Sequence, residues 1–261
     1  MTTIQQKLLA FAKEVAYPYI QQLPFYLEYE NDISVLLVGS AATGLCTEHS
    51  DVDICLLCRE NTFDEISKNA NWNSGHPTEI ILGNTQLHYY AAGFETLEKK
   101  IADYDDVVFY VYGSAIDLND NAGLFDKIKR NIFSDEIKNG RRHKSFDMLV
   151  RRNRALKQIL EIEPDPILRM AIGLEIIELI LKNIALADDT PFDKRKRFYS
   201  TALIGSFGCE AKPKIDNLIA CIGDISGIKS KEKDHEFLQI VDECIESLYE
   251  AQQKNGYSAK K

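Results

Sequence analysis

Two aspartates separated by one residue, Asp51 and Asp53, carry the clearest chemical signal in the chain. They lie in an apolar run that we expect to form a buried strand. Because side chains alternate faces along a strand, both carboxylates point the same way, while Val52, Ile54 and Leu56 point into a core. Two carboxylates on one face repel each other unless a cation lies between them. Mg²⁺ is the expected partner, since it is a hard ion held by one or two carboxylates together with phosphate oxygens.

A Gly-Ser turn precedes this pair. Residues 33–38 form a short apolar, β-branched run that predicts a buried strand, and Gly39 and Ser40 follow it directly. Glycine lets a phosphate approach the backbone closely, Ser40 adds a hydroxyl donor, and residues 41–45 are expected to form one helical turn whose N-terminus favours an anion. Ser50, directly before the aspartate pair, is a further polar candidate. The segment therefore predicts a metal-nucleotide site with Gly39, Ser40 and Ser50 as nucleotide-binding residues.

This pattern resembles the signature of the DNA polymerase β-like nucleotidyltransferase superfamily. Gly39-Ser40, ten further residues and Asp51-Val52-Asp53 match Gly-Ser-x-x-x-Gly-x5-Ser-Asp-x-Asp followed by an apolar residue. The resemblance covers residues 30–60, with a looser likeness of layout to residue 200. It implies an α+β chain, in which a small mixed-sheet catalytic domain precedes an all-α helical bundle, as in small bacterial antibiotic-type nucleotidyltransferases.

The resemblance implies a magnesium-dependent enzyme that moves a nucleoside monophosphate from a nucleoside triphosphate to a hydroxyl group and releases pyrophosphate. Asp51 and Asp53 would be catalytic and would hold two Mg²⁺ ions, with Mn²⁺ as the alternative ion. Replacing either aspartate is expected to nearly abolish activity without unfolding the chain.

A third carboxylate is expected on a neighbouring strand, and here the sequence departs from the simplest pattern. Residues 78–91 predict a hairpin around Gly83-Asn84 in which Glu79 lies opposite His88. By resemblance, the second strand of such a hairpin carries the third acid, so His88 stands in its position and Glu79 is the nearby carboxylate. Two interpretations stay open: Glu79 is a metal ligand or general base with His88 as its partner, or the two form an ordinary cross-strand pair.

Composition is consistent with an enzyme that works in the cytoplasm. The 261 residues carry a net charge of −9, which argues against a general nucleic-acid coat protein although a local basic patch can still bind RNA or a triphosphate. We find no signal peptide and no membrane span in the sequence. The six cysteines are scattered apart from Cys55 and Cys58, which lack further ligands for zinc, so free thiols are expected.

The pattern of predicted secondary structure changes near residue 120. Strands and short helices alternate before it, including a helix over 3–16 that is expected to break before Pro18 and a short strand beginning at Tyr110. Amphipathic helical patterns dominate after it, with one helix expected to start at 213. The predicted domains are therefore a catalytic domain over 1–120, a helical bundle over 121–254 and a polar tail over 255–261.

Two basic clusters lie in the helical half, one along residues 141–157 and one at residues 194–197. Such runs are usually solvated faces. By resemblance, however, a cation from the helical domain contacts the β- and γ-phosphates, which makes Lys194 and Arg195 the candidates for binding the triphosphate.

Three interpretations of the acceptor follow. The first is a small-molecule or protein acceptor, as in the antibiotic-modifying enzymes. The second is RNA 3′-end extension by a terminal nucleotidyltransferase, which usually needs a longer chain and a clear third aspartate. The third is a noncatalytic nucleotide-binding or antitoxin-type protein, which the missing third aspartate favours. A homodimer is compatible with each of them, because relatives with helical second domains often dimerise.

Overall fold

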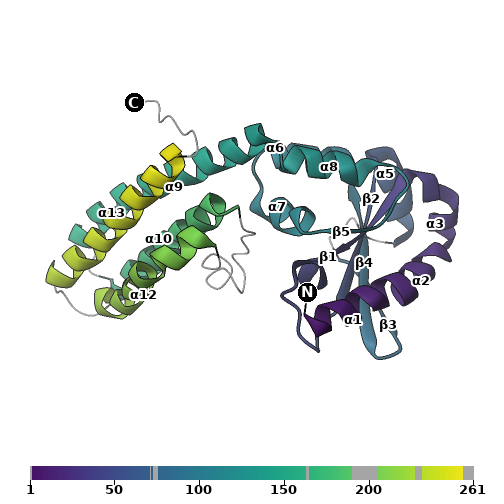
Figure 1. Ribbon diagram of the computed structural model, residues 1–261, viewed down its shortest axis with the longest axis horizontal. Coiled ribbons are helices and arrows are strands. Elements are labelled where there is room, and N and C mark those ends of the chain that lie inside the picture. Colours follow the sequence, from purple (N-terminus) through teal and green to yellow (C-terminus); the bar gives the residue numbers. More distant parts are fainter. Residues whose placement is uncertain are drawn as a thin grey trace. The chain divides into compact units, whose positions relative to one another are not determined.

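The structure, a computed structural model, describes residues 2–70, 72, 76–162, 165–189, 205–226 and 231–254. Contacts divide the chain into two compact units, residues 1–137 and 138–261. The first unit is built around a mixed sheet and the second consists of helices (Figure 1), so the chain is α+β.

Five strands form the sheet, in the spatial order β3-β4-β2-β1-β5. β1 runs antiparallel to β2 and β5, β3 runs antiparallel to β4, and β2 and β4 are parallel. β1 and β2 lie at the centre and are almost entirely buried, which agrees with their unbroken apolar sequences. The strands are β1 (Ile33–Val38), β2 (Val52–Cys58), β3 (Thr78–Leu82), β4 (Thr85–Gly93) and β5 (Ile116–Asp120).

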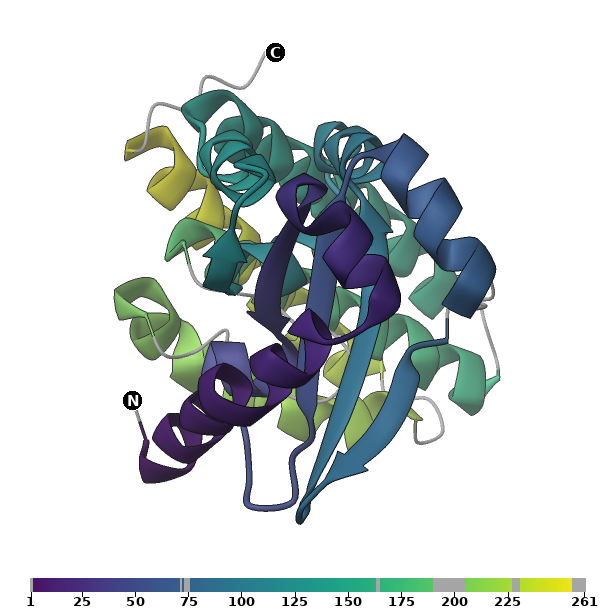
Figure 2. The ribbon, with the colours of Figure 1, turned by 90° about the vertical axis from the view of Figure 1, so that its right-hand side faces the viewer.

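One face of the sheet packs against helices from the start of the chain and against α5. Val52, Ile54 and Leu56 point into this core, as the alternation along β2 predicts. The first helices cross the sheet in front of its strands in Figure 2, where they are purple. The elements on this side are α1 (Thr3–Phe11), the π-helical segment η1 (Ala12–Ala16), α2 (Tyr17–Gln21), α3 (Pro24–Tyr29), the 3₁₀ turn η2 (Glu30–Asp32) and α5 (Glu60–Ala70).

The opposite face packs against α6 (Phe94–Ala102), α7 (Asp106–Gly113) and α8 (Leu124–Ile132). Cys55 and Leu57 of β2 point into this second core. Asp53 lies on the same face of β2 as Cys55, because the two residues are two positions apart in a strand. The carboxylate pair therefore lies beside an apolar core and at the end of a central strand.

The first helical stretch does not break before Pro18, contrary to the sequence prediction. It continues to Gln21 through five π-helical residues, and the Tyr17 N–H donates to the Ala12 carbonyl, five residues back. Proline has no N–H and clashes with the carbonyl four residues earlier. The wider π turn directly before Pro18 lets the chain continue as a helix past it.

The segment predicted as a strand from Tyr110 is helical up to Gly113, and only residues 116–120 form a strand. Asp105 explains the helix, because its side chain accepts hydrogen bonds from the N–H groups of Val107 and Val108 and so caps α7.

Helix α8 belongs to the first unit, although the sequence places the boundary at residue 120. Its buried residues Leu124, Phe125 and Ile128 join the core on the Cys55 side of the sheet. Asp120 fixes its start, since the side chain accepts from the N–H of Phe125 at 3.1 Å. The boundary between units consequently lies near residue 137.

The second unit contains helices packed around their own aliphatic core, with Ile180 of α10, Leu218 of α12 and Phe237 of α13 among its buried side chains. The helix predicted to start at 213 begins at Ser206 instead and contains Pro213 within it. The described helices are α9 (Asp135–Ile162), α10 (Pro166–Ala187), α12 (Ser206–Ser226) and α13 (Lys231–Lys254). Among the described residues, no helix is long and apolar enough to cross a membrane. The predicted tail, 255–261, lies outside these ranges.

Candidate functional site

Strand pairing brings the expected acids and the histidine together. Asp53 of β2 is directly opposite His88 of β4 in the parallel pair, and Asp51 immediately precedes β2. All three side chains are partly exposed, with 38% of Asp51, 28% of Asp53 and 17% of His88 accessible. The cluster therefore lies at the surface of the sheet, where a ligand can reach it.

His88 contacts both carboxylates through one ring nitrogen. Its Nδ1 lies 3.0 Å from Asp51 Oδ2 and 3.5 Å from Asp53 Oδ1. One ligand atom from each of these residues lies within 4.8 Å of the others. Three potential ligand atoms therefore converge on one point, and the mixture of two carboxylates and an imidazole can bind a divalent metal ion.

The hairpin has the register that the sequence predicts. Glu79 is opposite His88, Ile81 is opposite Gln86, and Gly83 in the turn has a positive φ of 64°. Glu79 Oε1 lies 3.9 Å from His88 Nε2, and its other oxygen accepts from Gln86 Nε2 at 3.5 Å. Glu79 is thus farther from the aspartates than His88 is, on the outer side of the imidazole.

Gly39 lies directly against Asp53. A Cβ atom placed on Gly39 would come within 2.1 Å of Asp53 Oδ2, and the residue has a φ of 69°, in the left-handed region. Both observations require glycine here. The predicted Gly-Ser turn is therefore next to the carboxylate pair, and α4 (Gly39–Thr43) begins at this glycine, two residues earlier than the expected helical turn.

Gln5 of α1 holds this turn in place, a contact that the sequence analysis does not predict. Its buried side-chain amide donates to the carbonyls of Ala41 at 3.1 Å and Ala42 at 3.3 Å. These carbonyls lie at the C-terminal end of the short helix, where backbone acceptors lack intrahelical partners. A glutamine in an amphipathic helix normally indicates a solvent-exposed position, so no sequence signal could have revealed the contact.

Buried, uncharged polar groups follow Asp53 on the same face of β2. Cys55 Sγ lies 3.5 Å from the Tyr112 hydroxyl, and Tyr90 belongs to the same buried group. Burial raises the pKa of the Cys55 thiol to about 12 and raises the pKa values of Tyr90 and Tyr112 well above their ordinary range. These groups stay protonated at neutral pH, so they add no charge to the site.

A cavity of about 190 Å³ opens beside Asp53. Its other lining residues are Trp72, His76, Pro77, Tyr90 and Ala91. Sequence reasoning did not find this cavity, because His76 is isolated in the sequence and Trp72 lies in the connection between α5 and β3. The cavity offers aromatic and imidazole surfaces next to a potential metal ligand.

The remaining predicted nucleotide-binding residues are placed less distinctively. Ser40 is the second residue of α4, and its carbonyl accepts from the Thr43 hydroxyl at 3.2 Å. The Ser50 hydroxyl accepts from the Thr47 N–H at 2.9 Å, within its own loop. Lys194 and Arg195 lie outside the described residues.

The basic cluster over residues 141–157 takes part in ion pairs within the second unit. Arg142 contacts Asp189 at 2.8 Å, Arg152 contacts Glu175 at 3.0 Å, and Lys157 contacts Asp242 at 2.7 Å. At these three positions the basic residues connect α9 to neighbouring segments, which is a structural role.

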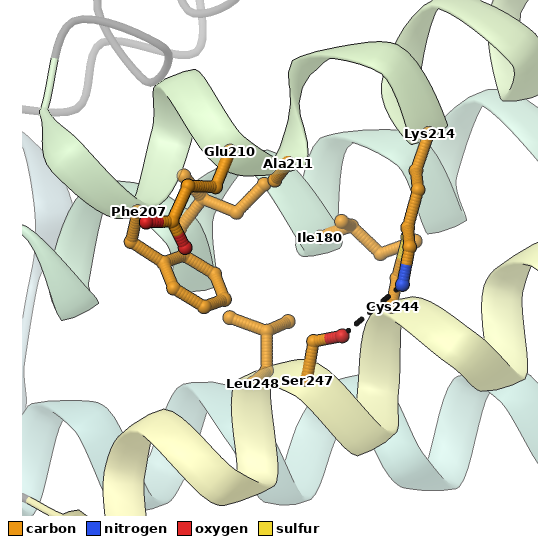
Figure 3. A pocket seen from close by; sticks show the side chains of 9 residues that line it. Ile180, Phe207, Glu210, Ala211, Lys214, Cys244, Ser247 and Leu248 are labelled. Carbon is orange, nitrogen blue, oxygen red and sulfur yellow. Dashed lines mark hydrogen bonds between the residues drawn. The ribbon is translucent and has the colours of Figure 1, made fainter.

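The second unit has a cavity of its own, of about 220 Å³, among α10, α12 and α13 (Figure 3). Aliphatic and aromatic side chains such as Ile180 and Phe207 form most of its wall. Lys214 donates to the Ser247 hydroxyl at 3.2 Å and lies 3.9 Å from Glu243, so its ammonium is engaged at the rim.

Comparison with known proteins identifies the class. The family model described as "Nucleotidyltransferase domain" matches residues 21–185, which is more than half of the chain. The chain therefore belongs to the nucleotidyltransferase domain family, of the DNA polymerase β-like type.

Among solved structures, one match is a nucleotidyltransferase-like protein from Exiguobacterium sibiricum 255-15. It is 13% identical in sequence, with a TM-score of 0.49, and the match covers 88% of this chain and 72% of that one. Comparison with proteins of curated function gave no significant match.

Proposed function

We propose that the protein is a metal-dependent nucleotidyltransferase that transfers a nucleoside monophosphate from a nucleoside triphosphate to a hydroxyl group of a small molecule. The observation that carries the proposal is the convergence of Asp51, Asp53 and His88 beside Gly39, in a chain that belongs to the family. Pyrophosphate is the second product.

Two features indicate that these residues suit a divalent cation. The Asp51 and Asp53 carboxylates are on one side of a strand and share the contact to His88 Nδ1, so a cation relieves their mutual repulsion. The Asp53 carboxylate has room to lie against the backbone at residue 39 because that residue is glycine, since a Cβ atom there would be 2.1 Å from Oδ2. Mg²⁺ or Mn²⁺ fits the oxygen-rich part of the donor set.

Each residue then has a role. Asp51 and Asp53 would hold the metal, which would supply Lewis-acid polarisation of the phosphate and activation of the acceptor hydroxyl. The backbone at Gly39 and Ser40 lies beside this pair and positions the triphosphate. Tyr90, Tyr112 and Cys55 are uncharged and so add no charge beside the aspartates. Rate enhancement comes from positioning and charge neutralisation.

The cavity beside Asp53 supports a small acceptor. Its volume of about 190 Å³ accommodates one ring-sized group, and Trp72, His76 and Tyr90 offer surfaces on which such a group can stack or form hydrogen bonds. An acceptor seated there has its hydroxyl next to a metal-binding carboxylate. A protein side chain or an RNA 3′ end is the alternative acceptor.

The test is a transfer assay with each α-labelled nucleoside triphosphate, Mg²⁺ or Mn²⁺, and separate pools of small hydroxylated molecules, proteins and RNA. We expect label on a small molecule with release of pyrophosphate. Asp53→Asn is expected to lower turnover by about 100-fold or more. Asp64→Asn, on the exposed side of α5, is the matched control and should leave turnover unchanged.

Three results would overturn the proposal. They are nucleotide binding without pyrophosphate release in every pool, label appearing on RNA or protein alone, and an Asp53→Asn turnover within a few-fold of the parent. The first of these would instead favour the noncatalytic interpretation. Far-UV circular dichroism of the variants excludes unfolding as the cause of any loss.

A further inference from the structure

His88 is surrounded by carboxylates on both sides of its ring. Nδ1 faces Asp51 and Asp53 at 3.0 and 3.5 Å, while Nε2 faces Glu79 Oε1 at 3.9 Å. Nε2 is buried, and among the described residues it has no hydrogen-bond partner. A buried ring nitrogen that faces a carboxylate is stabilised when it carries a hydrogen, since the hydrogen can point to the acceptor.

A hydrogen on Nε2 leaves the other ring nitrogen, Nδ1, without one in the neutral imidazole. When the hydrogen of a neutral imidazole is on Nε2, Nδ1 presents a lone pair, and here that lone pair points at two carboxylate oxygens. Three electron-rich atoms that face one another are stable only with a cation among them. Two ligand atoms at right angles on an ion with bonds of about 2.1 Å are about 3 Å apart, and the distance from Nδ1 to Asp51 Oδ2 is 3.0 Å.

We propose that His88 is a direct metal ligand through Nδ1, that Glu79 is the positioning residue whose carboxylate closes the 3.9 Å gap to Nε2–H and accepts from it when the metal is bound, and that the site therefore prefers Mn²⁺ and Co²⁺ to Mg²⁺. This rests on the proposed function, because it specifies the metal of the same site. The carboxylate–histidine–metal arrangement fixes both the ring and its tautomer.

The preference follows from the donor set. Mg²⁺ binds oxygen ligands and is held largely by negative charge, whereas imidazole nitrogen suits later divalent ions. An imidazole in place of a carboxylate removes one negative charge and adds one nitrogen donor. The lost charge weakens the binding of all three divalent ions, and the nitrogen donor offsets this loss more for Mn²⁺ and Co²⁺ than for Mg²⁺.

Binding of Mn²⁺ alone to the metal-free full-length chain tests the inference without any assay of activity. Pulsed electron paramagnetic resonance detects the coupling between Mn²⁺ and a directly bonded ¹⁴N nucleus. We expect the wild-type protein to show this coupling. Isothermal titration with Mn²⁺ and with Mg²⁺ then gives the ratio of the two affinities.

Variants at two positions distinguish the proposed metal ligand, His88, from the proposed positioning residue, Glu79. His88→Asp should abolish the nitrogen coupling, keep metal binding, and lower the Mn²⁺-to-Mg²⁺ affinity ratio by about 10-fold or more. Glu79→Ala should keep the coupling while weakening Mn²⁺ binding by about 10- to 100-fold, and Glu79→Gln should restore part of the loss, because its amide oxygen still accepts from Nε2–H. His49→Asn is the matched control: His49 is exposed, lies two residues before Asp51, and is expected to have no effect.

Several outcomes would overturn the inference. Nitrogen coupling that persists in His88→Asp assigns the ligand to another residue, and Mn²⁺ bound without coupling in the wild-type protein makes the site oxygen-only. Failure to bind Mn²⁺ means that an imidazolium ion takes the place of the metal. The two proposals fail separately: nitrogen coupling without nucleotidyl transfer refutes only the activity, whereas transfer with unchanged metal preference in His88→Asp refutes only the role of His88.

Discussion

Gly39 and Asp53 are in such close contact that no side chain fits between them. A Cβ atom on Gly39 would lie 2.1 Å from Asp53 Oδ2, closer than any ordinary contact between nonbonded atoms. Gly39 directly follows β1 and begins α4, and Asp53 lies near the start of β2, opposite Val38 at the end of β1.

We predict that Gly39→Ala lowers nucleotidyl transfer by about 100-fold, because the carboxylate must move away from the new methyl group and small displacements of catalytic groups are costly. The substitution also places alanine at a φ of 69°, which costs about 1–2 kcal/mol of folding free energy. Turnover and the midpoint of urea denaturation measure the two effects.

Gly123→Ala provides the matched control. Gly123 has a φ of 62°, and nothing lies within 4 Å of a Cβ atom added to it. It should therefore show the same backbone strain without the collision, so stability falls and turnover stays at the parental value. Equal turnover in both alanine variants would show that the contact with Asp53 is irrelevant to activity.

Local pattern was sufficient to predict much of the sheet. The unbroken apolar run 33–38 is β1, and the Gly83-Asn84 turn sets the pairing of Glu79 with His88 as predicted. Both features depend on neighbouring residues and on turn geometry, which the sequence contains directly. The domain family likewise follows from the Gly39 to Asp53 spacing.

Other features depend on contacts between distant parts of the chain. The pairing of β2 with β4 places His88 between Asp51 and Glu79, and no local pattern specifies which strand lies next to β2. The hydrogen bonds of Gln5 to the carbonyls after Ser40 join segments 36 and 37 residues apart. Pro18 predicts a break because hydrophobic periodicity does not reveal the π turn that precedes it.

The carboxyl group of Asp117 in β5 should make stability depend on pH. Although Asp117 is an exposed residue, partial desolvation of its carboxyl group, followed by the negative charges of Asp120 and Asp126, raises its pKa above the ordinary 3.8. The folded state therefore holds this proton more tightly than the unfolded state, so stability is lost as pH rises through the folded pKa. Asp117→Asn should raise the melting temperature at pH 7.

The gain from Asp117→Asn should vanish below pH 3.8, where the carboxyl group is protonated in both states of the parent. Asp64→Asn, at an exposed position of α5, controls for the loss of one negative charge from an acidic protein. A melting temperature that falls at pH 7, or a gain equal to that of Asp64→Asn, would contradict the unfavourable environment of Asp117.

The free cysteines should differ sharply in reactivity. Cys209 is exposed and Cys46 is half-buried, whereas Cys55, Cys58 and Cys244 are buried. Burial raises the pKa of Cys55 to about 12 and that of Cys244 to about 11, and it raises that of Cys58 further. Since the thiolate is the reactive species, the buried thiols should react about 100-fold more slowly at pH 8.

Mass spectrometry after a short maleimide pulse checks this prediction by locating the labelled positions. Modification should be confined to Cys46 and Cys209 in buffer and should reach all six cysteines in urea. Rapid labelling of Cys55 in buffer would indicate that the core next to the candidate site opens readily, which would contradict the burial of this residue.

An ion pair between Arg169 of α10 and Asp234 of α13 should contribute to the stability of the second unit. Only 10% of the Arg169 side chain and 16% of the Asp234 side chain are accessible. Asp234→Ala leaves a buried guanidinium without this partner, so we expect it to lower the free energy of unfolding by about 3 kcal/mol. Urea denaturation followed by far-UV circular dichroism measures this change in free energy. Tryptophan fluorescence does not report on the second unit, because the single tryptophan, Trp72, is in the first.

Two further variants test whether burial of the ion pair is the cause of the stability loss expected for Asp234→Ala. The Lys212–Asp216 pair, at 2.7 Å within α12, is about half exposed, so Asp216→Ala should cost less than about 1 kcal/mol. The double variant Arg169→Leu/Asp234→Leu removes both charges and should recover most of the loss, because the penalty comes from isolating one buried charge and not from losing the pair. If Asp234→Ala and Asp216→Ala were equally costly, the Arg169 pair would behave as a surface contact.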